Sequence, residues 1–170
     1  MKKSAVFLCA ALFAASLTLS AAPPDKSWLT DFKKAEAEAK AKKQPMFVVF
    51  TQSEGSQASK TFDEKVLASE KLKSFVRGKF VLAYLDCTQK SEAGKSNQAV
   101  AAQREVTTFP SVLVTDANGK TLANLGESSE EQILSRLKTI HTGTKKASGN
   151  AAKKADKKKT EKKSAEQVTD

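Results

Sequence analysis

The sequence has very few of the side chains that carry most protein chemistry, since its 170 residues include two cysteines and one histidine. A zinc site needs three or four ligands at suitable spacing, which His141 and Cys87 do not provide. A serine hydrolase would depend on His141, which lies at the end of the last predicted helix, where it complements the helix dipole. A glycine-rich phosphate loop is also missing. The sequence therefore predicts neither a metal site nor a bound cofactor.

The N-terminal residues have the layout of a secretory signal peptide. Two lysines precede an uncharged apolar run, 5–19, and three small residues, 20–22, follow it. The run is too short for a membrane span. Cys9 lies inside this run behind a bulky leucine rather than after a small-residue cleavage box, which disfavours a lipoprotein. We expect residues 1–22 to be removed during export to the periplasm or cell exterior, leaving no transmembrane segment in the mature chain.

Loss of the signal peptide would leave Cys87 as the only thiol, so an intramolecular disulfide is excluded. The simplest interpretation of Cys87 is a free thiol that packs as a small hydrophobe. A redox role would need exposure and a low pKa, whereas the neighbouring Asp86 would raise the pKa. The sharper alternative is an intermolecular disulfide.

The C-terminal segment, 142–170, holds nine lysines, four acidic residues and only one large apolar residue, Val168. This composition cannot bury enough surface to offset ordering entropy, so we expect a disordered tail after a single domain, 23–141. Of the total charge of +10, the tail carries +5 and the signal peptide +2, leaving +3 for the domain. A solvated tail is the default, and binding to an anionic surface is the alternative. Specific nucleic-acid recognition is not expected, because aromatic and arginine side chains are missing.

Within the domain, apolar periodicity and turn residues predict alternating helices and strands. Apolar runs predict strands at 46–50, 80–85, 111–115 and 121–125, the last two joined by a turn at Asn118-Gly119. We expect a first helix capped by Ser27 or Thr30, and a second helix that ends at Gly78 with a break near Ser69. A loop over 86–97 should lead into a short helix at 98–105. The last helix should begin with a capping box formed by Ser128 and Glu131. The sum is an α/β fold with a four-stranded mixed sheet and helices on both faces.

This order of elements carries several motifs of one family. They are Trp28 before a helix that ends in Lys-Lys-Gln-Pro, the Phe-Thr-Gln-Ser segment at 50–53, Leu-Asp at 85–86, and Val106 through Pro110. Together they resemble the thioredoxin-like superfamily, and more closely its exported branch, over about 27–140. The resemblance implies a thioredoxin fold with a reactive turn at the start of the helix after the first long strand.

The family's Cys-x-x-Cys pair corresponds here to Ser56 and Ser59, and Gly55 replaces the aromatic residue that often precedes it. Dithiol exchange needs one thiolate to attack and a second thiol to resolve the mixed disulfide. Serine hydroxyls can do neither, so we expect no dithiol oxidoreductase activity. The serines of this turn are better explained as helix caps, with Ser53 or Ser56 accepting hydrogen bonds from the first free N–H groups.

Pro110 matches the family proline that lies beside the reactive turn and is cis in relatives. The resemblance implies a groove for an extended peptide at Gly55, Ser56, Phe109 and Pro110, whereas a purely structural turn is the alternative.

The sequence therefore leaves two functions open. The preferred one is a non-catalytic peptide- or protein-binding module with an unknown partner. The other is a thiol–disulfide redox protein that acts through Cys87 or with a partner's thiol.

Overall fold

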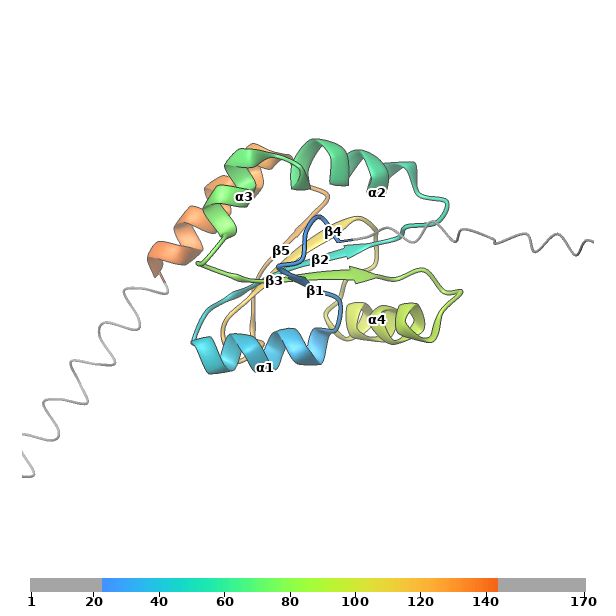
Figure 1. The fold of residues 1–170 in the computed structure, drawn as a ribbon, viewed down its shortest axis with the longest axis horizontal. Coiled ribbons are helices and arrows are strands. Elements are labelled where there is room, and N and C mark those ends of the chain that lie inside the picture. Colours follow the sequence, from blue (N-terminus) through green and yellow to red (C-terminus); the bar gives the residue numbers. More distant parts are fainter. Residues whose placement is uncertain (1–22, 144–170) are drawn as a thin grey trace, which may run out of the picture.

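The computed structural model describes residues 23–143, so the predicted signal peptide and nearly all of the predicted tail lie outside the described residues. A five-stranded sheet in the order β1-β3-β2-β4-β5 separates two layers of helices. In Figure 1, α1 and α4 cover one face, while α2, α3 and the last helix cover the other. The elements are β1 (Trp28–Leu29), α1 (Phe32–Lys42), β2 (Met46–Thr51), α2 (Gln57–Phe62), the π-helix η1 (Asp63–Leu67), α3 (Glu70–Val76), β3 (Val81–Asp86), α4 (Glu92–Gln103), β4 (Ser111–Thr115), β5 (Thr121–Gly126) and a last helix over 130–143.

The central strand β2 determines the fold. It is buried along its whole length, as expected for an apolar run covered on both faces. β3 pairs with it in parallel on one side, and β4 pairs antiparallel on the other, followed by the β4–β5 hairpin. The α/β thioredoxin fold with a mixed sheet and helices on both faces is therefore confirmed.

The sheet has five strands rather than the four predicted. The additional strand is β1, whose Trp28 and Leu29 pair in parallel with Leu82 and Ala83. Trp28 is buried edge-on against Phe47, with ring centroids 5.9 Å apart, so aromatic packing adds to the pairing that holds this short strand on the sheet.

The cap of α1 also differs from the prediction. It is Asp31, whose carboxylate accepts the Lys34 N–H at 3.1 Å, rather than Ser27 or Thr30. The helix starts later than predicted because the residues before it are used by β1.

The helix α4 begins six residues earlier than the predicted helix at 98, inside the segment predicted to be a loop. Ser91 caps it by accepting the Gly94 N–H at 3.0 Å. Its buried face consists of Gly94, Asn97 and Ala101. Because two of these residues are not hydrophobic side chains, the face lacks the apolar periodicity that identifies a helix from sequence.

The last helix is where the sequence predicts it, with Ile133 and Leu137 fully buried. Its capping box, however, is formed by Ser129 and Gln132, one residue after the predicted pair. The Ser129 N–H donates to Gln132 Oε1 at 3.0 Å, and the Gln132 N–H donates to Ser129 Oγ at 3.4 Å. Ser128 donates its hydroxyl to the Leu125 carbonyl instead.

Other turn predictions hold. Ser69 caps α3 at the predicted break, and its hydroxyl also donates to Glu130 at 2.6 Å, which links α3 to the last helix.

The hairpin between β4 and β5 turns at Gly119, which has a φ of 83°. Thr121 pairs with Thr115 and Ala123 with Val114, so Leu122 is the additional residue of a β-bulge.

Candidate functional site

Three strand ends meet at one edge of the sheet, and this edge contains the positions that the sequence singles out. Thr51 at the end of β2 lies opposite Asp86 at the end of β3, and Phe50 lies opposite Ser111 at the start of β4. The loop 52–56 leaves β2 here and enters α2. Because Pro110 immediately precedes β4, it lies at the same edge as that loop, which is the carboxyl-end location where open α/β sheets bind ligands.

Ser56 and Ser59, which the resemblance predicts to replace the family's cysteine pair, act as hydrogen-bond acceptors. Ser56 is the N-cap of α2, and its Oγ accepts the Ser59 N–H at 3.1 Å, which confirms the predicted cap. Ser59 is 1% exposed, and its Oγ accepts the Gln52 N–H at 3.2 Å. The pair therefore satisfies backbone donors of the loop and of the first helical turn.

Ser53 does not cap the helix but binds the carboxylate of Asp86. Its N–H donates to Asp86 Oδ1 at 3.2 Å, and its hydroxyl donates to Oδ2. The N–H and hydroxyl of Thr88 donate to Oδ1 at 3.0 and 2.7 Å. Burial alone would raise the pKa of Asp86, but these hydrogen bonds outweigh it and lower the pKa. Asp86 thus anchors the loop, a role that no local sequence pattern indicates.

A second carboxylate, Asp63, lies one helical turn after Ser59 and begins η1. Its Oδ2 accepts the Tyr84 hydroxyl at 2.7 Å, whereas its buried Oδ1 has no hydrogen-bond partner among residues 23–143. Burial raises the pKa of Asp63, the bond from Tyr84 opposes this, and the charges of Asp86 and Glu64 raise it further. Sequence reasoning missed this group. The one hint was an acidic residue on the otherwise apolar helical face of Phe62 and Val66.

Replacing Asp86 with asparagine should lower the free energy of unfolding by about 1–2 kcal/mol at pH 7, because hydrogen bonds to a charged acceptor are lost and the group is only half-buried. The lowered pKa means that the folded state holds this proton less tightly than the unfolded state. The stabilisation is therefore present above the ordinary pKa near 4 and is lost as the pH falls through the folded-state value. Urea unfolding of both proteins between pH 7 and pH 3 should show the difference shrinking with acid.

Asp63→Asn is the matched control for this prediction. Because the pKa of Asp63 is raised, its ionisation opposes folding once the pH exceeds the ordinary value. The stability of Asp63→Asn relative to the natural chain should therefore rise with pH, opposite to the trend for Asp86→Asn. Parallel trends for the two variants would contradict both assignments.

Cys87 is fully buried and follows β3 directly, an environment that suits its predicted packing as a small hydrophobe. Its N–H donates to the Thr51 carbonyl at 2.8 Å, while its side chain packs among Phe32, Phe50 and Val106 on the α1 and α4 side of the sheet. Burial, with a smaller contribution from Asp86, raises the pKa of Cys87 to about 12.

This environment predicts that the Cys87 thiol has low reactivity toward alkylating reagents. Compared with an exposed cysteine of pKa near 8.5, the thiolate fraction at neutral pH is about 3,000-fold smaller, and alkylation should be slower by at least that factor. Iodoacetamide labelling of native protein, followed by mass spectrometry, measures the rate, with urea-unfolded protein as the reference. Labelling of the native state at the unfolded rate would show that Cys87 is accessible.

The segment before β4 offers free backbone groups at the same edge. The Phe109-Pro110 peptide bond is cis, Pro110 is buried and Phe109 is half-buried. Thr107 and Thr108 are exposed, and the main chains of Thr107, Thr108 and Phe109 make no backbone hydrogen bond within the described part of the chain. Gly55, across the edge, is exposed with a φ of 78°.

None of five pockets found among residues 23–143 is lined by Gly55, Ser56, Phe109 or Pro110. A partner at this edge would meet the unpaired backbone donors and acceptors of 107–109.

His141 lies away from this edge of the sheet. The ring of His141 packs near Phe75 and Phe80, with centroids 6.3 and 6.2 Å away, and Phe80 lies at the opposite end of β3 from Asp86. Between residues 23 and 143, no three His, Cys, Asp or Glu side chains are grouped to hold a metal ion. Over the same residues, no helix has the length and apolar character required to cross a membrane.

Comparison with protein families gives a match to the thioredoxin-like domain over residues 32–141. The chain belongs to the thioredoxin-like domain family. The match spans Ser56, Ser59 and Pro110, and their correspondence with the family's reactive turn and neighbouring proline stays a prediction. Comparison with curated protein sequences gives no match.

Solved structures of redox proteins share this thioredoxin-like fold. The oxidoreductase DsbH is 26% identical with a TM-score of 0.59, over 68% of this chain and 83% of that one. A thioredoxin from Thermus thermophilus is 19% identical with a TM-score of 0.55, over 67% and 87%. The C-terminal domain of Neisseria meningitidis DsbD in its oxidised form is 14% identical with a TM-score of 0.52, over 66% and 97%. The last two show likeness of fold alone.

Proposed function

We propose that this thioredoxin-like protein is exported and uses the edge between the Ser56 turn and Pro110 to bind an extended peptide or a segment of a partner protein without catalysis. The observation that carries the proposal is the unpaired main chain of Thr107, Thr108 and Phe109 beside an intact turn. Exposed backbone donors and acceptors of this kind support strand addition by a partner.

Loss of dithiol exchange follows from the chemistry of the turn. Ser56 and Ser59 cannot form a disulfide, and both hydroxyls already accept backbone hydrogen bonds. The thiol of Cys87 is buried on the α1 and α4 face of the sheet, opposite the face covered by α2, with its pKa raised. A redox role through Cys87 would require the domain to open, and no observation favours it over binding.

The proposals of export and of attachment to an anionic surface are argued from the sequences of the two ends of the chain. The signal-peptide layout of 1–22 supports export, and the nine lysines of 142–170 support binding to anionic lipid or polymer. Binding of the exported chain to phosphatidylglycerol vesicles should fall steeply as salt rises from 50 to 200 mM. Deletion of 142–170 should abolish it, and unchanged binding after deletion would remove this part of the proposal.

The peptide-binding proposal is tested with the 15N-labelled exported chain and peptides from reduced, carboxymethylated ribonuclease. Amide signals of Gly55, Ser56 and 107–109 should shift on titration. Thr108→Pro removes one backbone N–H and should weaken binding at least fivefold, whereas Thr107→Ala keeps the backbone donor and should bind normally. Shifts elsewhere only, or unchanged affinity of Thr108→Pro, would overturn the proposal.

The redox part has its own test. The exported chain should reduce insulin with dithiothreitol no faster than its Cys87→Ser variant does. A faster rate in the natural chain would favour the thiol–disulfide function instead.

A further inference from the structure

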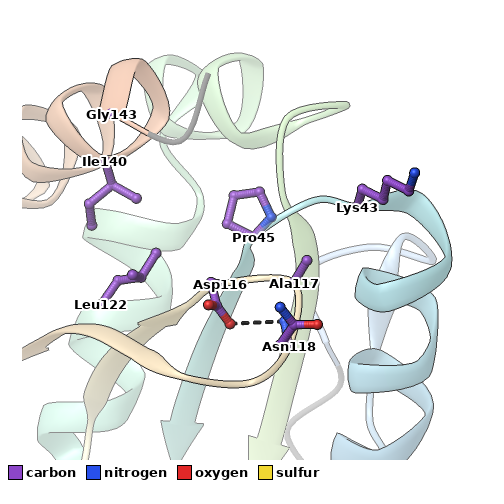
Figure 2. Close-up of a pocket in the computed structure, with 8 residues that line it drawn as sticks. All are labelled: Lys43, Pro45, Asp116, Ala117, Asn118, Leu122, Ile140 and Gly143. Carbon is purple, nitrogen blue, oxygen red and sulfur yellow. Dashed lines mark hydrogen bonds between the residues drawn. The ribbon is translucent and has the colours of Figure 1, made fainter. Parts of the chain in front are cut away.

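A pocket of about 470 Å³ lies beside the first residues of β2, whereas the Ser56 edge lies at the other end of that strand; Figure 2 shows the residues that line the pocket. It is formed where β2 begins, where the β4–β5 hairpin turns, and where the last helix reaches residue 143. This volume is far larger than the roughly 30 Å³ that one water molecule occupies, so the pocket has room for side chains. Its lining residues are Lys43, Pro45, Asp116, Ala117, Asn118, Leu122, Ile140 and Gly143.

The interior of the pocket is apolar. Figure 2 shows Leu122 and Ile140 extending into the same space, with the ring of Pro45 beside them. Leu122 is the additional residue of the β-bulge in β5, and it lines this pocket. Leu122 and Ile140 are both only half-buried. Covering this surface with aliphatic groups would therefore be favourable.

The rim carries one carboxylate oxygen available to a cation. Asp116 Oδ1 accepts the N–H groups of Asn118 at 2.8 Å and Lys120 at 2.9 Å, whereas its Oδ2 accepts no hydrogen bond from the described residues. In Figure 2 the side chain of Lys43 points away from Leu122 and Ile140. The pocket thus presents aliphatic surface next to an anionic group, which matches a lysine side chain, with its four-carbon stem and terminal ammonium.

The chain itself supplies such side chains at the right place. Gly143 lines the pocket, and the residues that follow it are Thr144, Lys145 and Lys146. We propose that the Thr144–Lys146 segment occupies this pocket, with a lysine stem over Leu122 and Ile140 and its ammonium paired with Asp116 Oδ2. Docking fixes the start of the tail at the end of the domain opposite the binding edge. The later lysines, from 153 onward, are then held away from that edge.

The test uses the exported chain with labelled leucine and isoleucine methyl groups and a soluble gadolinium relaxation agent. Lys145→Glu/Lys146→Glu should expose the methyl groups of Leu122 and Ile140 and raise their paramagnetic relaxation at least twofold. Asp116→Asn should give a smaller increase at the same methyl groups. Lys153→Glu/Lys154→Glu, which makes the same charge change further along the tail, should have no effect.

Each other outcome overturns the proposal. Equal relaxation in the natural chain and in Lys145→Glu/Lys146→Glu would mean that the segment does not cover the pocket. An equal effect of Lys153→Glu/Lys154→Glu would indicate general attraction of the tail rather than a local site. Protection that disappears on dilution would identify a second copy of the chain as the occupant. Methyl signals elsewhere in the core report whether each variant is folded.

Discussion

Replacing both Ser56 and Ser59 with cysteine is expected to convert this chain into a disulfide reductase. A cysteine at 56 would occupy the N-cap of α2, where the N–H of residue 59 donates to Ser56 Oγ at 3.1 Å in the natural chain. This donor and the start of the helix favour a thiolate and lower its pKa. A cysteine at 59 would lie in the buried first turn as the resolving thiol. Insulin reduction with dithiothreitol should rise at least tenfold above the background rate.

The single variants are the controls, all made with Cys87→Ser. Ser56→Cys should give a reactive thiol that forms mixed disulfides but does not resolve them, and Ser59→Cys should be nearly unreactive because that position is 1% exposed. If the folded double variant does not reduce insulin, the turn has lost more than its sulfur atoms. The prediction that Ser56 and Ser59 stand at the positions of the family's cysteine pair would then be wrong.

Gly94→Ala is expected to destabilise the domain by about 1–3 kcal/mol, although helix propensity alone would favour alanine by about 1 kcal/mol. A Cβ at this position would lie 1.7 Å from the carbonyl oxygen of Thr88, so α4 must move away from the 86–88 segment. That segment carries Asp86 and Thr88, and α4 also holds it through Asn97, whose side chain donates to the Asp86 carbonyl at 2.9 Å. The displacement should therefore reach the Ser53 loop.

Ser96→Ala is the matched control, because Ser96 is exposed on the same helix and should tolerate alanine with slight stabilisation. Urea unfolding measures the stability of both variants, and the amide shifts of Ser53 and Thr88 measure the displacement. A Gly94→Ala protein as stable as Ser96→Ala would show that α4 packs less closely than the structure indicates.

Strands could be predicted here more reliably than helices. β2, β3 and β4 are buried along nearly their whole length, so each appears as an uninterrupted apolar run bounded by polar or turn residues. β1 was missed because it has only two residues and is held by pairing with β3. The start of α4 was missed because its buried positions, Gly94 and Asn97, are the small or polar residues that otherwise indicate loops.

The sequence by itself determined the thioredoxin-like fold and the lack of a cysteine pair at 56 and 59. Covalent chemistry depends on which atoms are present, and no folding can supply missing sulfur. Only the tertiary structure showed that Asp86 binds Ser53 and Thr88, that Asp63 meets Tyr84, and that Leu122 and Ile140 share a pocket with Asp116. Most of these partners lie on different elements, which sheet register and helix packing bring together. Local sequence patterns therefore do not predict these contacts.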